Sequence, residues 1–220
     1  MIIEARDIRK SFGSLEVLKG VDIAIDRGEI VSIVGTSGAG KTTLLQILGT
    51  LDRADSGELR IDGTDIMGMN NRKQAEFRNR RLGFIFQFHR LLPEFTALEN
   101  VMIPALIAGK SRKEASCEAE RLLSDLNLSD RASHKPSELS GGEKQRIAVA
   151  RALVNHPAII LADEPTGNLD EKNQKLVMKI FHELHDEGHT ILTVTHSAEV
   201  GEEAQRCVII EHGHMRERTA

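Results

Sequence analysis

The sequence predicts an α/β fold with a mixed, mostly parallel sheet. Three short apolar runs, Ile30–Val34, Ile159–Ala162 and Ile191–Val194, lie far apart along the chain. Continuous apolar runs of this length are typical of central strands that are buried on both faces. Helical patterns separate the runs, and parallel strands need such crossover connections. Together these observations favour a parallel sheet covered by helices.

Two segments near the N-terminus predict a second kind of strand. Ile2–Ile8 and Val21–Ile25 alternate between apolar and polar residues. This period of two places every second side chain on the same face, as in half-buried antiparallel strands. We therefore expect an antiparallel β subdomain beside the mostly parallel sheet.

Two longer segments have the pattern of helices. Ser111–Leu126 begins with a capping box, in which Ser111 and Glu114 satisfy each other's backbone donors. The segment from about Glu171 to Glu187 carries an apolar stripe with helical spacing. The members of this stripe are Leu176, Val177, Ile180, Phe181 and Leu184.

The domain organisation follows from where the strands stop. The stretch at about 92–155 is mostly helical and contains no obvious central strand. We predict a single domain over residues 1–220, with a core at about 1–91 and 156–220. A helical subdomain at about 92–155 is inserted into that core.

Composition excludes several functions. The formal charge is 29 minus 33, or −4, so the chain lacks the general basic field of a nucleic-acid-binding protein. Seven Phe with no Tyr or Trp argue against a platform on which single strands stack. Cys117 and Cys207 lie far apart without CxxC spacing, which favours a reducing compartment over disulfides or a zinc site.

The hydropathy pattern predicts a cytosolic chain. The first residues, Met1–Arg6, lack the basic stretch and apolar run of a signal peptide. No apolar run approaches the roughly 18 residues that span a bilayer. The most apolar loop region, Val101–Ala108, is expected to be interrupted by Pro104.

A glycine-rich segment after the first apolar run matches the pattern GxxxxGK[ST]. Glycines allow the tight turn that directs successive N–H groups at phosphate oxygens, and the following helix adds its positive N-terminal dipole. Lys41 would reach the β- and γ-phosphates, and the Thr42 hydroxyl would ligate Mg²⁺. The segment comprises Gly35, Thr36, Ser37, Gly38, Ala39, Gly40, Lys41, Thr42 and Thr43. This motif predicts a P-loop nucleoside triphosphatase, a class that includes kinases, GTPases and ATPases.

An acidic pair ends the second apolar run. Asp163 and Glu164 follow Ile159–Ala162, at the carboxyl end of a predicted parallel strand, where ligands bind in such sheets. Asp163 would hold the Mg²⁺ shell. Glu164, one residue further, would orient and deprotonate the attacking water.

A third motif lies at the start of a predicted helix. Ser140 and Glu143 form a capping box, and Gly141 and Gly142 leave backbone N–H groups uncovered. A helix start of this kind can bind an anion. On these residues alone, a capped helix without further function is the alternative.

The string Leu139-Ser140-Gly141-Gly142-Glu143 resembles the signature motif of ABC transporter ATPases. Further motifs of that family occur along the chain in the family's order. Gln87 precedes this string, and it is followed by Asp163-Glu164-Pro165-Thr166, Asn168-Leu169-Asp170 and Thr195-His196. The resemblance covers nearly the whole chain. It implies the ABC ATPase fold with a RecA-like core, ATP and Mg²⁺ as cofactors, and transport-coupled hydrolysis. It also implies a nucleotide-sandwich dimer with a second copy, and integral membrane subunits in separate chains.

The same resemblance assigns individual roles. Gln87 would contact Mg²⁺ and water, and His196 would contact the γ-phosphate. Ser140, Gly141, Gly142 and Glu143 would act on the nucleotide of the partner copy, and Asp170 would cross the dimer interface. Phe12 occupies the place of the aromatic that stacks on adenine; simple edge packing of this ring is the alternative.

The segment Phe86–Val101 looks like that of ATPases from bacterial lipoprotein-releasing systems. That type belongs to a group with macrolide-efflux and cell-division ATPases, which stay as alternatives. The resemblance implies a peripheral protein at the cytoplasmic face of the inner membrane. Leu91, Leu92 and Phe95 would form a docking groove for the membrane subunit, rimmed by Glu94 and Glu99, or they would simply pack the subdomain.

Overall fold

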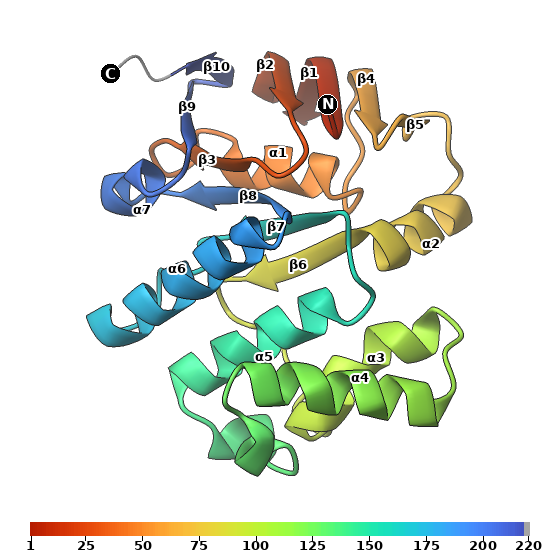
Figure 1. Cartoon of the computed structure of the whole chain (residues 1–220). Helices are drawn as coiled ribbons and strands as arrows, with labels where there is room; N and C mark the ends of the chain where they lie inside the picture. The colour runs from red at the N-terminus through yellow and green to blue at the C-terminus, as the bar shows by residue number, and fades with distance from the viewer. Residues whose placement is uncertain (218–220) are drawn as a thin grey trace. The chain divides into compact units, whose positions relative to one another are not determined.

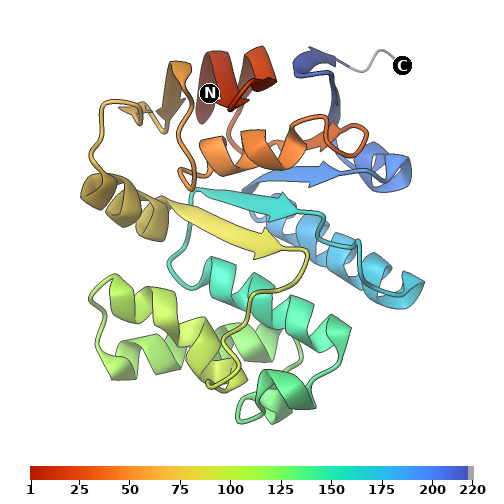
Figure 2. The same cartoon turned by 180° about the vertical axis from the view of Figure 1, so that it is seen from behind.

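The computed structural model describes residues 1–217, except for the side chains of Ala198 and Glu199 (Figures 1 and 2). The chain divides into two compact units, which are Met1–Ala75 with Phe181–Ala220, and Glu76–Ile180. It passes from one unit to the other within α2 (Asn71–Arg81) and within α6 (Glu171–Asp186). The second unit therefore includes two strands in addition to the helical stretch predicted at 92–155.

An antiparallel sheet forms one part of the first unit. Its strands are β1 (Ile3–Phe12), β2 (Leu15–Ile25), β4 (Ser56–Ile61) and β5 (Thr64–Asp65), in the order β2-β1-β4-β5. The register pairs Ile3 with Ile25 and Phe12 with Leu15, so the hairpin closes over two residues. Gly13 in this turn has a φ of 61°, which glycine adopts without strain. The predicted antiparallel strands are confirmed.

Parallel strands form the other part of the first unit. β3 (Ile30–Val34) lies between β8 (Thr190–Thr195) and β9 (Arg206–Glu211), and β10 (His214–Glu217) pairs antiparallel with β9. The unit also contains α1 (Lys41–Leu48) and α7 (Ala198–Glu202). Buried Ser32 and Thr193 on adjacent strands satisfy each other through a 2.6 Å hydroxyl pair. Both strands expected here, β3 and β8, are confirmed.

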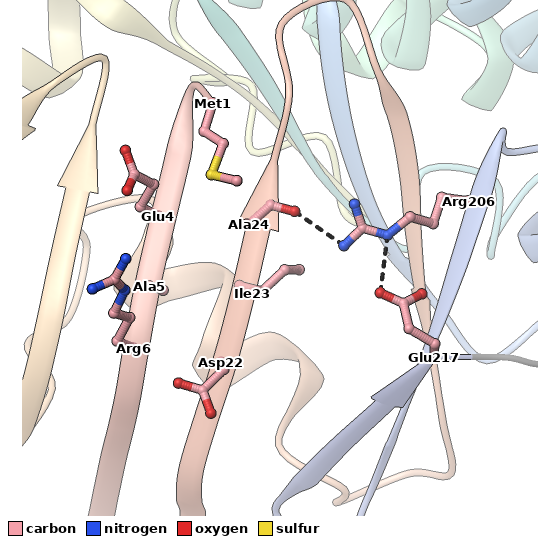
Figure 3. A pocket seen from close by; sticks show the side chains of 9 residues that line it. All are labelled: Met1, Glu4, Ala5, Arg6, Asp22, Ile23, Ala24, Arg206 and Glu217. Atoms are coloured by element: carbon pink, nitrogen blue, oxygen red, sulfur yellow. Dashed lines mark hydrogen bonds and ion pairs between the residues drawn. The ribbon is translucent and has the colours of Figure 1, made fainter.

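Arg206 on β9 links the two sheets of the first unit. Its guanidinium donates to the Ala24 carbonyl at 3.0 Å and to the carboxylates of Glu29 and Glu217 at 3.0 and 3.2 Å. An open pocket of about 390 Å³ lies beside it, lined by charged side chains of β1, β2 and β10 (Figure 3). No residue of the glycine-rich loop lines this pocket.

The second unit contains a parallel strand pair, β6 (Leu82–Phe86) and β7 (Ile159–Asp163). The structure confirms β7, whereas the sequence pattern did not single out β6. Gly83 explains why that strand is hard to recognise. A Cβ on Gly83 would lie 2.7 Å from the carbonyl oxygen of Ala152, so close packing against a distant helix requires a glycine there.

Three helices pack together in the second unit, α3 (Ala97–Ile107), α4 (Arg112–Asp125) and α5 (Gly141–Leu153) (Figure 1). Two short 3₁₀ turns, η1 (Ser129–Arg131) and η2 (Pro136–Glu138), connect α4 to α5. Residues 92–155, all described by the structure, contain no strand, as expected. The capping box of α4 is also confirmed, with Ser111 N–H donating to Glu114 at 2.8 Å and Glu114 N–H donating to the Ser111 hydroxyl at 3.2 Å.

The expectation of a loop at Val101–Ala108 is wrong, because α3 continues through Pro104 to Ile107. A capping box of Thr96 and Glu99 starts the helix, and one face is buried through Val101 and Ala105. Proline removes one N–H donor from a helix interior. The Pro104 carbonyl, in contrast, is well satisfied by Ala108 N–H and by the amides of Asn79 and Asn155. Packing therefore outweighs the local cost of the proline.

Within residues 1–217, no helix combines the length and the apolar character needed to cross a membrane.

Candidate active site

The site residues predicted from the sequence fall in both units. Phe12, Gly35–Thr43 and His196 belong to the first unit, and Gln87, Ser140–Glu143, Asp163, Glu164 and Asp170 to the second. Each group is held by its own local contacts.

The glycine-rich loop connects β3 to α1 in the first unit. The α1 N-cap, Gly40, has a φ of 103° and makes no side-chain hydrogen bond to the first turn. The first backbone N–H groups of α1 are therefore not capped by a side chain, which suits an anion. Lys41 is buried, and its ammonium donates to the carbonyls of Gly35 at 2.7 Å and Thr36 at 3.0 Å. These bonds keep the cation over its own loop.

Two of the loop glycines are required by close packing. A Cβ on Gly35 would overlap the carbonyl oxygen of Ile210 on β9. A Cβ on Gly40 would lie 2.8 Å from the Leu18 side chain and 3.2 Å from the Val17 carbonyl on β2. The loop therefore packs closely against β9 and β2, and these strands fix its backbone path.

Phe12 lies at the exposed end of β1, where 53% of the residue is accessible. The Lys10 ammonium lies 5.3 Å from the ring centroid. Lys10 is itself fixed by Asp52 at 3.1 Å and by the Arg53 carbonyl at 2.7 Å. The ring is therefore held at the surface rather than packed into the sheet edge.

His196 directly follows β8 and is exposed. The Thr195 hydroxyl accepts a hydrogen bond from Ser197 N–H at 3.0 Å, and Ser197 in turn caps α7 through Val200 N–H at 3.3 Å. The backbone on both sides of His196 is thereby fixed at the end of its strand.

The acidic pair lies at the carboxyl end of β7 in the second unit. Asp163 is the last residue of the strand, and Glu164 follows with a φ of 46°. A left-handed conformation is costly for glutamate, and such conformations concentrate at functional sites. Both residues are half-buried. The chain thus turns sharply at the residue predicted to be the catalytic base.

Gly167 brings Gln87 and Glu164 together. A Cβ on Gly167 would lie 3.1 Å from the Gln87 side-chain nitrogen and 3.5 Å from the Glu164 Cβ. The Asn168 amide also donates to the Gln87 carbonyl at 3.4 Å. The motif residues predicted from the sequence leave out Gly167, although its place between Thr166 and Asn168 is a usable signal.

The capping box at the start of α5 is confirmed. Ser140 N–H donates to Glu143 at 2.8 Å, and Glu143 N–H donates to the Ser140 hydroxyl at 3.3 Å. These bonds to Ser140, together with the Arg131 guanidinium at 2.8 Å, lower the pKa of Glu143 to about 2. Ser140 and Gly141 are exposed, so the helix start faces solvent.

Asn173 joins this helix start to the loop that carries Asp170. It donates to the Asp170 carboxylate from its backbone at 2.8 Å and from its side chain at 3.0 Å. A Cβ on Gly142 would overlap the Asn173 side chain. In addition, the buried Gln145 amide donates to the Pro165 carbonyl at 2.7 Å. No pattern in the sequence indicates Asn173 or Gln145, because their contacts with Gly142 and Pro165 join separate segments.

A family model and known relatives each match most of this chain. The family model described as ABC transporter matches residues 18–167. The chain is 83% identical over 218 residues to the lipoprotein-releasing system ATP-binding protein LolD of Porphyromonas gingivalis, covering 99% of this chain and 97% of that protein. It is 58% identical over 216 residues to the protein of the same description from Bacteroides thetaiotaomicron, covering 98% and 99%.

Solved structures give the same answer for the fold. The dimeric structure of MJ0796, a bacterial ABC transporter cassette, matches with a TM-score of 0.90 and 36% identity over 99% of each chain. A dimeric post-hydrolysis state of MJ0796, bound to ADP and Pi, matches with the same TM-score and identity. The predicted mixed α/β fold of ABC ATPases is thereby confirmed. Motifs, fold and relatives agree, and the chain belongs to the ABC transporter family.

Proposed function

We propose that this chain is the ATP-binding subunit of a lipoprotein-releasing ABC system, and that it hydrolyses ATP to release lipoproteins from the inner membrane. The observation that carries the proposal is 83% identity over 218 residues to a protein described as the ATP-binding protein of such a system. The start of α1, which no side chain caps, and the buried Lys41 supply the phosphate-binding chemistry that this activity needs.

Nucleotide binding uses the first unit. The backbone donors of Gly35–Thr43 hold the phosphates, Lys41 contacts the β- and γ-phosphates, and the exposed ring of Phe12 stacks on adenine. Exposure of 53% leaves enough of the ring accessible for this contact. His196 contacts the γ-phosphate from the end of β8.

A Mg²⁺ ion fits the donor set that the sequence indicates. Thr42, Gln87 and Asp163 offer hydroxyl, amide and carboxylate oxygens, which are the hard ligands that Mg²⁺ prefers. The described residues contain no cluster of three or more His, Cys, Asp or Glu side chains suited to a metal, and Mg²⁺ is usually held by one or two carboxylates together with substrate phosphates. When bound, Mg²⁺ neutralises charge that develops on the phosphates.

Hydrolysis needs a base near the attacking water. Glu164 takes this role because it follows Asp163 and has the strained φ of 46°. Gln87 lies beside Glu164 around Gly167 and orients the same water. The water oxygen bonds to the γ-phosphorus as the bond from that phosphorus to the β–γ bridging oxygen breaks. The proton of the water passes to the Glu164 carboxylate, and ADP leaves.

The chain works as a dimer. Ser140, Gly141, Gly142 and Glu143 act on the nucleotide of the partner copy, and Asp170 crosses the interface. Support comes from the exposed start of α5, from its contact with the Asp170 loop through Asn173, and from the dimeric assembly of MJ0796. The start of α5 can bind an anion. In the proposed dimer that anion is the phosphate of the nucleotide held by the partner copy.

Integral membrane subunits in separate chains dock on the segment after Gln87, which keeps this protein at the cytoplasmic face of the inner membrane. Phe88, Leu92 and Phe95 are 74%, 43% and 40% exposed. This exposure favours docking over packing of the subdomain. Of the two acidic residues predicted at the rim, Glu99 takes part in the capping box of α3. Glu94 is therefore the rim residue that contacts the membrane subunit.

The experiment is depletion of this protein followed by complementation. Leu92→Glu should leave outer-membrane lipoproteins in the inner membrane, because a charge enters the docking groove, while ATP binding by the purified chain persists. Leu106→Glu is the matched control, since Leu106 is 40% exposed on α3 outside the segment. Membrane fractionation measures the outcome. Normal sorting after depletion, with a division defect or drug sensitivity, would favour the cell-division or efflux alternative.

A further inference from the structure

Two consecutive residues after Gln87 adopt a backbone conformation that their side chains disfavour. His89 and Arg90 have φ values of 55° and 49°. L-residues other than glycine avoid this left-handed region, and two in succession persist only where surrounding contacts impose them. The segment begins one residue after the exposed Phe88 and lies within the second unit.

One side chain contacts the backbone of both residues. The Arg151 guanidinium, on α5, donates to the His89 carbonyl at 2.6 Å and to the Arg90 carbonyl at 2.6 Å. Arginine presents its donors in a rigid planar fork, so a single side chain can fix two neighbouring carbonyls in one orientation. Burial lowers the pKa of Arg151 to about 10, and at neutral pH the group stays charged.

Two further contacts hold the same turn. The Arg90 guanidinium lies 4.3 Å from the centroid of the Phe86 ring. The His89 backbone N–H donates to the carbonyl of Phe86, the last residue of β6, at 2.9 Å. His89 and Arg90 are therefore held by the last turn of α5 and by Phe86 at the end of β6.

Neighbouring carbonyls are fixed in a similar way by other elements. Asn168 donates to the Gln87 carbonyl at 3.4 Å, and Asn100 on α3 donates to the Leu92 carbonyl at 3.1 Å. The segment after β6 is thus fixed at the Gln87 carbonyl and at the Leu92 carbonyl, which flank His89 and Arg90 along the chain. The two bonds from Arg151 are the shortest of these contacts and are charge-assisted.

We infer that Arg151 is a positioning residue, which holds His89 and Arg90 in the left-handed conformation and thereby orients Gln87 beside Glu164. Arg151 does not touch the reacting atoms; it acts through the backbone of the segment after β6. This inference rests on the proposed function, because it concerns the hydrolysis to which Gln87 contributes.

The first test is the ATPase activity of the full-length chain carrying Arg151→Met, which keeps most of the side-chain length and removes the donors. We expect kcat to fall by at least about tenfold, because two charge-assisted hydrogen bonds are lost. KM for ATP should stay within about twofold, because Gly35–Thr43 is unchanged. Arg151→Lys should also be slow, since one ammonium cannot reproduce the planar fork. Arg121→Met, at an exposed arginine of α4, is the control.

The second test separates backbone conformation from general damage. Arg90→Gly and Arg90→Ala both remove the contact with Phe86, but only glycine adopts a left-handed φ without cost. Added to Arg151→Met, Arg90→Gly should recover at least about threefold in kcat over Arg90→Ala. If Arg151→Met does not fold, as judged by circular dichroism, the same pair is made with Arg151→Lys.

The outcomes separate this inference from the proposed function. ATPase activity of the unaltered chain that disappears in Glu164→Gln supports the proposed function. Wild-type kcat in Arg151→Met, or equal rates in the glycine and alanine double variants, would overturn the role of Arg151 while that function stands. Activity that does not depend on Glu164 would instead remove the proposed function.

Discussion

Glu164 combines position with backbone strain at the level of a single residue. It follows the last residue of β7, has a φ of 46°, and lies near Gln87 around Gly167. The cost of that conformation is of the order of 1–3 kcal/mol, and residues held in this way concentrate at functional sites. Asp163, the last residue of β7, does not have a positive φ.

Glu164→Gln should bind ATP normally and lose hydrolysis by about 10² or more, because the amide cannot accept the proton of the attacking water. ATP should then hold the dimer together, which light scattering measures. Lys41→Ala is the contrasting variant, since it should lose ATP affinity instead. Turnover near that of the unaltered chain would exclude Glu164 as the base.

At the scale of an element, the start of α5 is stabilised by charge. The hydrogen bonds to Ser140 and the ion pair with Arg131 lower the pKa of Glu143 to about 2. A carboxylate whose pKa is lower in the folded chain than in the unfolded chain stabilises the fold above the unfolded pKa, here 4.5. That stability is lost as pH falls from about 4.5 towards 2.

Glu143→Gln keeps a hydrogen-bonding side chain at this position and removes the charge. It should lower the free energy of unfolding by roughly 1 kcal/mol at pH 7, since the Arg131 side chain is partly exposed and screened by solvent. The difference from the unaltered chain should shrink between pH 5 and pH 3. Urea unfolding at several pH values measures it, with Glu94→Gln as the control at an exposed loop position. If the difference in free energy of unfolding does not change with pH, it does not come from the charge of Glu143.

At the scale of the whole molecule, the residues for one reaction are divided between two copies of the chain in the proposed dimer. The start of α5 and the Asp170 loop are joined by Asn173 and Gly142, so both would reach the partner as one surface. A change at this surface should therefore affect dimer closure and leave nucleotide binding intact.

Ser140→Arg should bind ATP and fail to hydrolyse it, because bulk and positive charge enter the phosphate site of the partner. Ser140→Ala removes the N-cap, at a cost of about 1 kcal/mol, without adding bulk or charge. Its ATPase rate should fall less than that of Ser140→Arg, because only the cap and the hydroxyl are lost and nothing blocks the interface. ATPase rates and ATP-dependent dimerisation are measured for both variants. Hydrolysis by Ser140→Arg at the normal rate would contradict the shared site.

Local pattern was sufficient for several elements. β3, β7 and β8 were predicted because continuous apolar runs of strand length describe burial on both faces. The capping boxes of α4 and α5 were predicted because their partners lie three residues apart, within one helical turn. The glycine-rich loop between β3 and α1 belongs to the same class, since the order of strand, loop and helix is itself a local signal.

The family, the order of the motifs and the chemistry available at each motif can all be predicted from the residues alone. Three other features depend on how separate segments pack. They are the continuation of α3 through Pro104, the contact of Asn173 with Gly142, and the hold of Arg151 on His89 and Arg90. Arg151 and its two carbonyl partners are 61 and 62 residues apart along the chain. Contacts of this range leave no periodic or spacing signal, because they arise only when separate elements pack and their unpaired backbone groups must be satisfied.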